Sequence, residues 1–540
     1  MQTVSRIDEW KQAHQRSLLN ESFVEVSLDI ADPEAIKDAK SADNGAIYIS
    51  NSSLVTDGLD HSPVPYCTLE QNLWCLDGGR KALPNNDYGD NGYIGDVLSD
   101  DTCIFSSKLP VITITFDAEK SYTALVPGIT ITWSKTYEEF ADTFEVTVYK
   151  GNTIVTSKEV TNNRSVTSIV LAEMSWYDRI TITVKKWCLP NHRARVEEIF
   201  VGLHKVYGKA NLFNYAHGQS VDPTSLALPK NEITFAIDNS SGEYNPHNKD
   251  GLAKYLMERQ EVKARYGLKM DDGSVEWIKA GTFYLAEWYA KQNGLTAEFT
   301  GRDIFELLSD TYHDTSNYLT ERSLFELAET ILSTANLPLN SDGTRKWLID
   351  ESLKDIKVNV NLPEDTMANL LQLIANAGMC VLYQDRDGTL HIEPLNFEET
   401  DYEIGSLNSY SRSEISLSKP LGVVKIKAYN YGLDTSIDVN HVLSSKGETI
   451  TIDNPLVTYY IDDDGLDTTY AKRVAEWVAT YLKHRMTLDS SWRPDVRLDA
   501  LDIVTNKNDY NSNQVCMTEV NYKFNGAFRA TGKGKVISDG

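Results

Sequence analysis

Hydrophobic and polar residues alternate in several stretches of this chain, a pattern that predicts half-buried β-strands. The alternation is strict over 23–30 (FVEVSLDI). It returns at Ile233–Ile237, which closes on Asp238-Asn239, and at Thr449–Ile452, which closes on Asp453-Asn454. The matching ends of the last two stretches suggest that one β-rich module occurs twice in the chain.

Two Asn-Gly pairs support this duplication. Asn293-Gly294 and Asn525-Gly526 lie downstream of the two stretches, between alternating segments. Asn-Gly in that setting predicts a tight β-hairpin, because both central residues must adopt positive φ angles. Each return strand then reaches Thr-Gly and a basic residue, Thr300-Gly301-Arg302 in one copy and Thr531-Gly532-Lys533 in the other. Chance is the alternative, since such short strings are common.

Short strands recur at near-regular spacing between residues 109 and 205, with no helical pattern among them. This spacing predicts an antiparallel β-sandwich. Because barrel-like strands precede and follow it, we expect the sandwich to be inserted into the first module. The expected strands are Val111–Phe116, Ile129–Trp133, Phe144–Tyr149, Thr153–Ser157, Val166–Val170 and Ile180–Val184.

Between residues 310 and 400 the hydrophobic period changes from two to about 3.6 residues. Ser323-Leu324-Phe325-Glu326 is a capping box that begins one helix, and a second helix is expected to end at Gly378 in the left-handed conformation. A strand, the turn Asp385-Arg386-Asp387-Gly388 and another strand complete a compact α+β unit.

These patterns predict a multidomain, β-dominated α+β fold with two related β-barrel-like domains. Residues 1–39 would supply an N-terminal helix and the first strand of barrel 1, and residues 40–205 the inserted sandwich. The remaining parts are 206–309 for the rest of barrel 1, 310–400 for the α+β domain, and 401–540 for the second barrel, with a long helix over Thr468–Met486.

Composition and charge narrow the class of protein. The chain has 540 residues, enough for several domains, and a formal net charge of −26. That charge repels phosphate backbones, so no sequence-specific nucleic-acid partner is expected. No run of about 18 apolar residues exists, which excludes a membrane-spanning helix. The polar N-terminus lacks the apolar core of a signal peptide, so synthesis and assembly in a cytosol are expected.

Candidate chemistry is sparse. The six cysteines lack CxxC and zinc-finger spacing, and the acidic turns 385–388 and 462–465 lack the ligand pattern of an EF-hand. No P-loop, GxGxxG, HxxxH or nucleophile-elbow pattern is present. Arg302-Asp303 could form an active-site pair, but a strand-to-helix junction capped by Asp303 explains the two residues better. We expect no catalytic residue, cofactor or metal site.

Aromatic residues of the expected sandwich could stack on sugar rings. Trp176 and Tyr177 lie beside Ser175 and Asp178 in an expected loop, which makes them the candidate glycan contacts. Core packing explains Trp133, inside an expected strand, equally well.

Three parts of the chain together resemble tail hub, or tail-tip, proteins of phages and prophages of Gram-positive bacteria. One runs from 281–285 (GTFYL) to 299–303 (FTGRD), and another from 369–378 (NLLQLIANAG) to 385–390 (DRDGTL). The third joins 453–456 (DNPL), the helix 471–482, 492–494 (WRP), 501–504 (LDIV) and the final hairpin. The motif residues that the resemblance marks as structural are Gly294, Gly301, Arg302, Asp303, Gly378, Asp387, Gly388, Trp492, Asp502 and Gly526.

This resemblance implies a baseplate or tail-tip hub subunit with two related barrels separated by α+β domains. It also implies a homotrimer that caps the tail tube. The implied neighbours are the distal tail protein, the tube protein, the tape-measure protein, and receptor-binding or fibre proteins. Three copies of a doubled module would match a sixfold tube. The expected location is the tail tip or baseplate of the virion.

The chain departs from this family in two respects. The inserted sandwich resembles the jelly-roll, carbohydrate-binding-like modules of some hubs, so host cell-wall glycan is a candidate partner. The chain also stops after the second barrel, whereas many relatives continue into a peptidase, a lysozyme or a fibre. Two other functions stay open: a carbohydrate-binding adhesin that acts through the sandwich, and a wall hydrolase, which the missing catalytic residues disfavour.

Overall fold

The computed structural model shows a β-dominated protein with several sheets and few helices, as predicted. None of the helices among the described residues is long and apolar enough to cross a membrane. The residues that the structure describes are 1–4, 6–15, 21–57, 64–74, 78–81, 91–117, 119–291, 294–314, 321–335, 337–340, 344–396, 399–462, 465–507 and 512–537.

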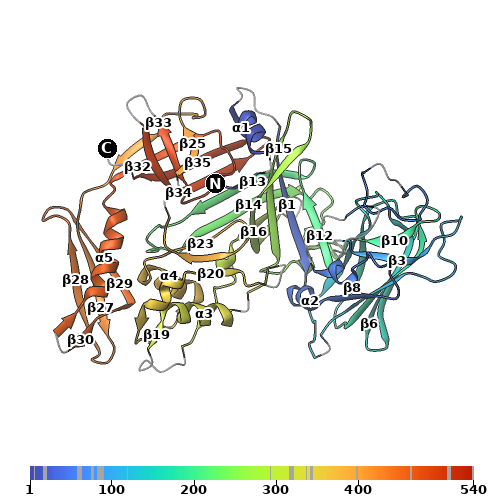
Figure 1. The fold of residues 1–540 in the computed structure, drawn as a ribbon, viewed down its shortest axis with the longest axis horizontal. Coiled ribbons are helices and arrows are strands. Elements are labelled where there is room, and N and C mark those ends of the chain that lie inside the picture. The colour runs from blue at the N-terminus through green and yellow to red at the C-terminus, as the bar shows by residue number, and fades with distance from the viewer. Residues whose placement is uncertain are drawn as a thin grey trace.

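The largest element is one sheet of 13 strands (Figure 1). Its main path is β12-β1-β15-β16-β17-β14-β13-β34-β35-β32-β26, while β33 pairs with both β34 and β25. A single hydrophobic core follows the sheet, and the predicted N-terminal helix, α1 (Ile7–Gln15), adds the fully buried Trp10 to it. The strands are β1 (Ser22–Ala31), β12 (Gly202–Tyr207), β13 (Leu212–Ser220), β14 (Lys230–Asp238), β15 (Glu261–Lys269), β16 (Val275–Ala290), β17 (Thr296–Arg302), β25 (Glu399–Ile404), β26 (Glu414–Leu417), β32 (Met486–Trp492), β33 (Ile503–Lys507), β34 (Ser512–Phe524) and β35 (Phe528–Val536).

Apart from β12, which pairs with β1, this sheet consists of two modules with the same connectivity. We call β1 with β13 to β17 the N-module, and β25, β26 and β32 to β35 the C-module. When the strands of each module are numbered in chain order, both modules have the spatial order 1-4-5-6-3-2. One pair differs in direction, since β1 and β15 are antiparallel whereas β25 and β33 are parallel. The inferred duplication is therefore present in the strand order.

The duplication extends to an unusual backbone conformation. Arg259 lies three residues before Val262 in the fourth strand of the N-module, and Leu501 lies three residues before Val504 in the fourth strand of the C-module. Their φ angles are 68° and 76°. Such left-handed angles are uncommon for residues other than glycine. Each residue donates its backbone N–H to the fifth strand, Arg259 to the carbonyl of Leu285 at 2.7 Å and Leu501 to that of Met517 at 2.6 Å. The two modules therefore match residue by residue here.

This match sets the register between the modules. A β-bulge interrupts the fifth strand at Ala286 in the N-module and at Thr518 in the C-module. The residue before the bulge lies opposite Gly301 in one module and opposite Gly534 in the other. The structural equivalent of Gly301 is therefore Gly534, two residues beyond the Gly532 that the Thr-Gly motif suggested.

The sequence analysis predicted that Thr449–Ile452 is the second copy of the strand Ile233–Ile237. This prediction is wrong. That run lies in β29 (Glu448–Thr458), which belongs to a separate sheet, β28-β27-β29. Asp453-Asn454 continue β29 instead of ending it. The third strand of the C-module is β32. Alternation misled the prediction because every half-buried strand shows it.

Both predicted hairpins join the fifth strand of a module to its sixth. β34 and β35 are antiparallel, and three residues, 525–527, connect them. Among these three residues only Gly526 has a positive φ, 81°, so the turn is not the predicted two-residue type. β16 and β17 are also antiparallel. Gly294 lies between them, and Asn293 is outside the described residues.

Strand pairing among the described residues closes neither module into a barrel. β13 of the N-module pairs with β34 of the other module, and β26 of the C-module pairs with β32 only. The predicted barrels are thus two open modules of one continuous sheet.

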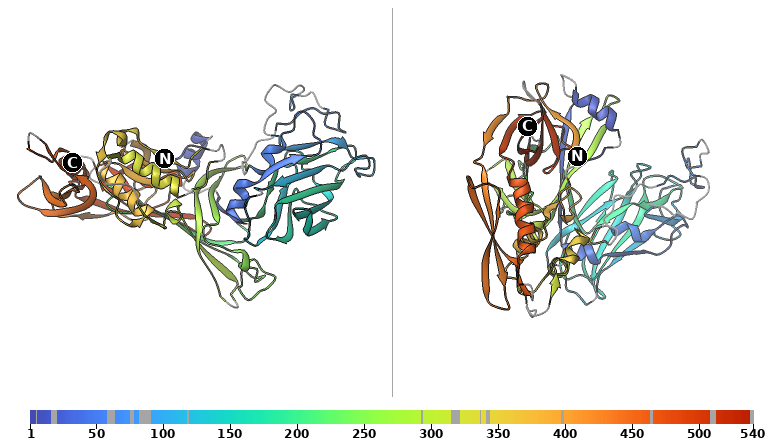
Figure 2. Two further views of the ribbon diagram at one scale, coloured as in Figure 1. Left: turned by 90° about the horizontal axis from the view of Figure 1, so that it is seen from below. Right: turned by 60° about the vertical axis from the view of Figure 1, so that its left-hand side comes forward.

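An insertion separates the first and second strands of the N-module. Two sheets, β2-β4-β9-β6-β7 and β11-β5-β8, face each other across one core, consistent with the predicted sandwich, and form a lobe beside the modules (Figure 2). Ala31 at the end of β1 is paired with Gly202 at the start of β12. The strands are β2 (Lys40–Asp43), β4 (Val111–Thr115), β5 (Val126–Thr132), β6 (Ala141–Lys150), β7 (Thr153–Val160), β8 (Thr167–Met174), β9 (Arg179–Trp187) and β11 (Glu198–Phe200).

A second core unites the α+β unit with an insertion into the C-module. The predicted capping box of Ser323 and Glu326 begins α3 (Leu324–Thr334). The helix α5 (Thr469–Leu482) packs on the sheet of β27 (Leu421–Asn430), β28 (Thr435–Val442) and β29, which lies between β26 and β32 in the chain. The helix α4 (Met367–Ala377) contacts β29.

The end of α4 differs from the prediction. Gly378 caps the helix at φ −79°, a right-handed angle, so the expected left-handed stop is wrong at this residue. The left-handed residue is the next one, Met379, at φ 56°.

The tighter packing around Gly534 than around Gly301 can be tested by adding a methyl group at each. A Cβ at Gly534 would lie 2.7 Å from the backbone carbonyl oxygen of Cys516, whereas the nearest atoms at Gly301 are side-chain carbons at 3.2 Å. We expect Gly534→Ala to lower the free energy of unfolding by about 1–3 kcal/mol and Gly301→Ala by less, because backbone cannot move aside as a side chain can. Urea denaturation of both variants measures this, and equal effects would contradict it.

Candidate functional site: the junction between the two sheet modules

Strand pairing joins the two modules. β13 of the N-module is antiparallel to the second half of β34, from Tyr215 opposite Phe524 to Ser220 opposite Glu519. The first half of β34 pairs with β33 along the same side. β34 therefore serves both modules, and we call the β13–β34 contact the module junction.

The side chains that face the core at the module junction are buried. Val520 and Tyr522 from β34 are fully buried, and His217 and Gln219 from β13 are nearly so. The Nδ1 atom of His217 lies 2.6 Å from the hydroxyl of Tyr266. Burial lowers the pKa of His217 to about 4, so the imidazole is neutral at neutral pH. The junction thus has a packed interior with no charge on the histidine.

An ion pair between the buried Arg386 and the partly buried Asp499 attaches the α+β unit to this junction. Arg386 lies in the turn between β23 (Val381–Gln384) and β24 (Leu390–Glu393), and it is 3% exposed. Its Nε donates to Oδ1 of Asp499 at 2.8 Å. Its Nη atoms donate to the backbone carbonyl oxygens of Lys279 in the N-module and Val496 beside the C-module, both at 2.8 Å. One guanidinium group therefore bridges three parts of the chain.

Asp499 is the acceptor at the centre of this network. It accepts hydrogen bonds from the side-chain amides of Gln2 at 2.8 Å and Gln219 at 3.0 Å. Burial raises the pKa of Asp499, but the charge and hydrogen bond of Arg386 outweigh burial and hold this pKa below its usual value. Gln219 also accepts from the backbone N–H of Ala500 at 3.0 Å. The carboxylate is thus ionised and fully engaged.

An open cavity of about 890 Å³ borders the network. Its walls include residues 1–4, Asp303, Asp499 and Asp502. The ammonium group of Met1 binds Oδ1 of Asp502 at 2.7 Å, and burial raises the pKa of Asp502. These wall groups mostly bind one another, which favours a role in holding the junction together.

Asp303 is the exception on this wall. It accepts a hydrogen bond from the backbone N–H of Phe305 at 3.2 Å and so caps a short 3-10 helix, as the sequence suggested. Its Oδ2 has no hydrogen-bond partner in the described part of the chain. Burial raises the pKa of Asp303 to about 8. Arg302 does not pair with Asp303, and its ion-pair partners are Glu232, Glu287 and Glu306.

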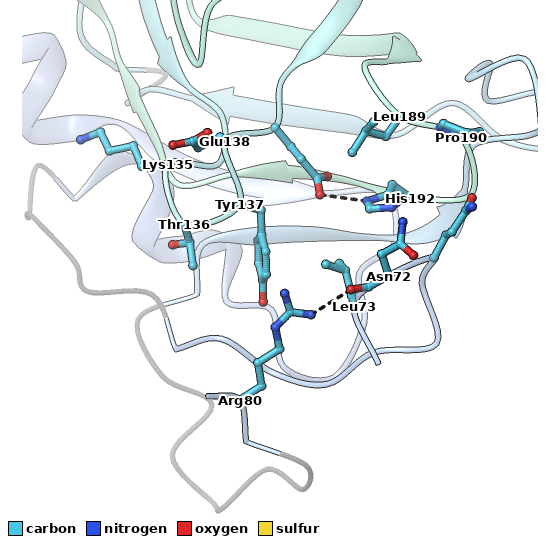
Figure 3. Close-up of a pocket in the computed structure, with 12 residues that line it drawn as sticks. Asn72, Leu73, Arg80, Lys135, Thr136, Tyr137, Glu138, Leu189, Pro190 and His192 are labelled. Carbon is cyan, nitrogen blue, oxygen red and sulfur yellow. Dashed lines mark hydrogen bonds and ion pairs between the residues drawn. The ribbon is translucent and has the colours of Figure 1, made fainter. Parts of the chain in front are cut away.

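The inserted sandwich has a cavity of its own, of about 550 Å³ (Figure 3). The guanidinium groups of Arg80 and Arg195 lie over the ring of Tyr137, 5.4 and 4.9 Å from its centroid. Glu139 and His192 are in contact at 2.9 Å. Burial lowers the pKa of His192, but Glu139 outweighs burial and leaves this pKa raised. An aromatic ring among polar groups in a cavity suits a small polar ligand.

The two candidate glycan contacts have different surroundings. Tyr177 is fully buried and stacks on Tyr122, with ring centroids 5.8 Å apart, so no face of its ring is free for a sugar. Trp176 is 55% exposed, and its φ is 57°. It does not line the cavity of Figure 3.

The other motif residues are spread over both modules and the α+β unit. Asp387 and Gly388 follow Arg386 in its turn, where Asp387 forms an exposed ion pair with Lys279 and Gly388 has a φ of 86°. Trp492 is fully buried in the shared core. The structure therefore brings only Asp303, Asp502 and the turn of Arg386 to one place.

Sequence analysis missed three residues of the site: Arg386, Asp499 and Gln219. Arg386 lies inside the acidic turn 385–388, and an arginine between two aspartates was the available signal. Neither Asp499 nor Gln219 is in a distinctive motif. In the described ranges, no group of three or more His, Cys, Asp or Glu side chains is placed to hold a metal ion.

Loss of the Arg386 guanidinium group alone should destabilise the junction. Arg386→Met leaves the carboxylate of Asp499 without its buried cation, so we expect the free energy of unfolding to fall by about 3–5 kcal/mol. The double variant with Asp499→Asn should recover part of this loss. Urea denaturation measures both, with Lys279→Met, which removes an exposed ion pair, as a control that loses less than about 1 kcal/mol. A single variant as stable as the control would contradict the bridge.

The pKa of Asp303 predicts how stability depends on pH. Because this pKa is raised in the folded protein, the folded state binds more protons than the unfolded state between about pH 4 and pH 8. Stability should therefore fall as pH rises through that window, by up to about 1.4 kcal/mol per pH unit. Asp303→Asn should flatten this slope. Melting temperatures of both proteins at pH 5, 7 and 9 give the comparison, and parallel curves would contradict it.

Comparisons with known proteins complete the description of the site. No protein-family model matches the chain, and no curated protein matches it in sequence. Among solved structures, it is similar to a tail protein from Neisseria meningitidis MC58, with 13% identity and a TM-score of 0.43 over 62% of this chain and 94% of that one. It is also similar to the 43 kDa tail protein of prophage MuSo2 from Shewanella oneidensis, with 11% identity, a TM-score of 0.39, and coverage of 61% and 94%.

A third similar structure is a chain of the p2 virion baseplate in its activated conformation. The identity is 10%, the TM-score is 0.28, and the match covers 65% of this chain and 94% of that one. The structural neighbours of this protein thus include phage tail and baseplate proteins. At these identities and TM-scores the likeness extends to part of the fold and not to function.

Proposed function

We propose that this chain is a structural hub subunit of a phage or phage-like tail tip, which assembles as a homotrimer and caps the tail tube. The observation that carries the proposal is the pair of modules with the order 1-4-5-6-3-2 in one continuous sheet. Three copies of such a chain contain six equivalent modules. A threefold assembly can then present a near-sixfold face to a sixfold tube.

The site supports a mechanical role without catalysis. Arg386, Asp499 and Asp502 are engaged with one another or with nearby chain, so their charges hold the modules in a fixed relation. A ring subunit needs this rigidity, because small changes in the angle between modules would prevent closure.

The proposed neighbours follow from a position at the end of the tube. One face of the ring would contact the tube and tape-measure proteins. The other would contact the distal tail protein and receptor-binding or fibre proteins. The inserted sandwich forms a separate lobe beside the modules, where it can reach other subunits or the cell surface (Figure 2). A Gram-positive host stays a prediction of the resemblance.

Binding of host cell-wall glycan by the sandwich is the second candidate function. The cavity around Tyr137 favours it, because an aromatic ring flanked by arginine and carboxylate groups can bind a sugar by stacking and hydrogen bonds. This function is compatible with a hub, since the cavity lies in the insertion and not at the module junction.

The mass in solution tests the hub proposal. We expect a particle of three times the 60.7 kDa chain mass by light scattering, and incorporation into rings when the cognate tube protein is added. Trimers should persist at micromolar concentration because a ring is closed by three interfaces at once. A monomer at every concentration that binds cell-wall glycan would contradict the hub and support the adhesin. Release of soluble muropeptides from cell walls would instead support a hydrolase.

A further inference from the structure

Among the strand edges of the sheet that have no partner in the described residues, one lies in each module at matching places. β26, the second strand of the C-module, pairs with β32 on one side only. The second half of β16, Ala286–Ala290, pairs with β17 on one side, while the pairing of β15 along the other side ends at Tyr284. Unpaired edges are places where another strand can add.

The strands equivalent to these two edges pair with each other inside the chain, at the module junction. β26 and β13 are both second strands, and β16 and β34 are both fifth strands. β13 pairs with the second half of β34 at the junction. The two free edges are thus the same two surfaces that are already joined once within each chain.

The register of that missing contact follows from the equivalences. In the N-module, Ile233 of the third strand lies between Gly301 of the sixth strand and His217 of the second strand. In the C-module, Leu488 lies in the same way between Gly534 and Ile415. Ile415 is therefore the equivalent of His217. Transfer of the junction register to the free edges gives the pairs Ile415 with Ala290, Ser416 with Tyr289, Leu417 with Trp288, and Ser418 with Glu287.

Side chains that are buried on β13 at the module junction have exposed equivalents on β26, as expected if β26 also has a partner strand. His217 and Gln219 are 1% and 7% exposed at the junction, whereas their equivalents Ile415 and Leu417 are 59% and 61% exposed. Ile415 lies opposite the buried Leu488, so both face the core side of the sheet. Two aliphatic side chains thus point inward with nothing over them.

The fifth strands show the same difference. Val520 and Tyr522 are fully buried under β13. Their equivalents in β16, Trp288 and Ala290, are only partly buried, although both pack against the shared core. Each free edge therefore exposes apolar core-facing side chains where its counterpart inside the chain is covered.

We infer that β26 of one copy adds to the second half of β16 of the next copy, and that this contact repeats the β13–β34 pairing between chains. The inference rests on the proposed function and names the interface that closes the ring. Six strands lie between the two edges along the sheet of one chain, so the partner is a second copy. The edges differ from each other, which makes the contact head-to-tail and compatible with a closed ring.

A disulfide across the inferred register tests this contact. Ser416 and Tyr289 would lie directly opposite each other, and opposed residues of antiparallel strands have Cα atoms about 4.5–5.5 Å apart, within reach of a disulfide. The variant with Ser416→Cys and Tyr289→Cys should form covalent dimers and trimers on oxidation. Neither single variant should do so, nor should Ile154→Cys with Tyr289→Cys, since Ile154 is exposed on β7 of the sandwich.

A charge at the edge gives a second measurement. Leu417→Asp should lower the trimer fraction at a fixed micromolar concentration at least tenfold, while Leu466→Asp, at an equally exposed leucine of the short strand β31 (Gly465–Asp467), should leave it unchanged. Unchanged far-ultraviolet circular dichroism spectra would show that both variants fold. A stable trimer with no cross-link and no effect of Leu417→Asp would overturn the inferred contact and leave the hub standing. A monomeric wild-type protein would overturn both.

Discussion

The structure depends on the double pairing of β34. One side of this strand is divided between β33 and β13, so a single strand satisfies the backbone hydrogen bonds of two modules. The bulge at Thr518 and the left-handed residue Leu501 mark the point where one partner gives way to the other. Bulges bend and twist a strand locally, which lets β34 leave its own module and enter the next. The modules thereby share one core and are not two domains in contact.

A buried guanidinium group reinforces this arrangement from outside the sheet. Removal of Arg386 and Asp499 from water is unfavourable, and only close geometry with further hydrogen bonds offsets that cost. The carbonyl acceptors from both modules supply those bonds. The α+β unit is therefore attached to the junction by an interaction that is sensitive to position. This favours specificity of the arrangement more than its stability.

The sequence predicted the class of fold and the existence of a repeat, but not the register of the repeat. Hairpins were recognisable because Gly526 supplies a turn that few residues allow. The equivalence of Arg259 with Leu501 was invisible, since an unusual backbone angle there is imposed by surrounding hydrogen bonds and not by residue type. The prediction for Thr449–Ile452 was wrong because alternation shows that one face of a strand is buried. It does not show to which sheet the strand belongs. Arg386 and Asp499 are 113 residues apart, and no local pattern connects them.

The pairing of Ala31 with Gly202 bears on how this protein could change. The whole sandwich leaves the sheet and returns at adjacent positions, in the manner of a very long hairpin loop. Domains whose ends are close together can be inserted or exchanged without strain on the host. The sandwich is therefore an exchangeable domain. Related chains could have another recognition domain or a short turn at this position and keep the same sheet.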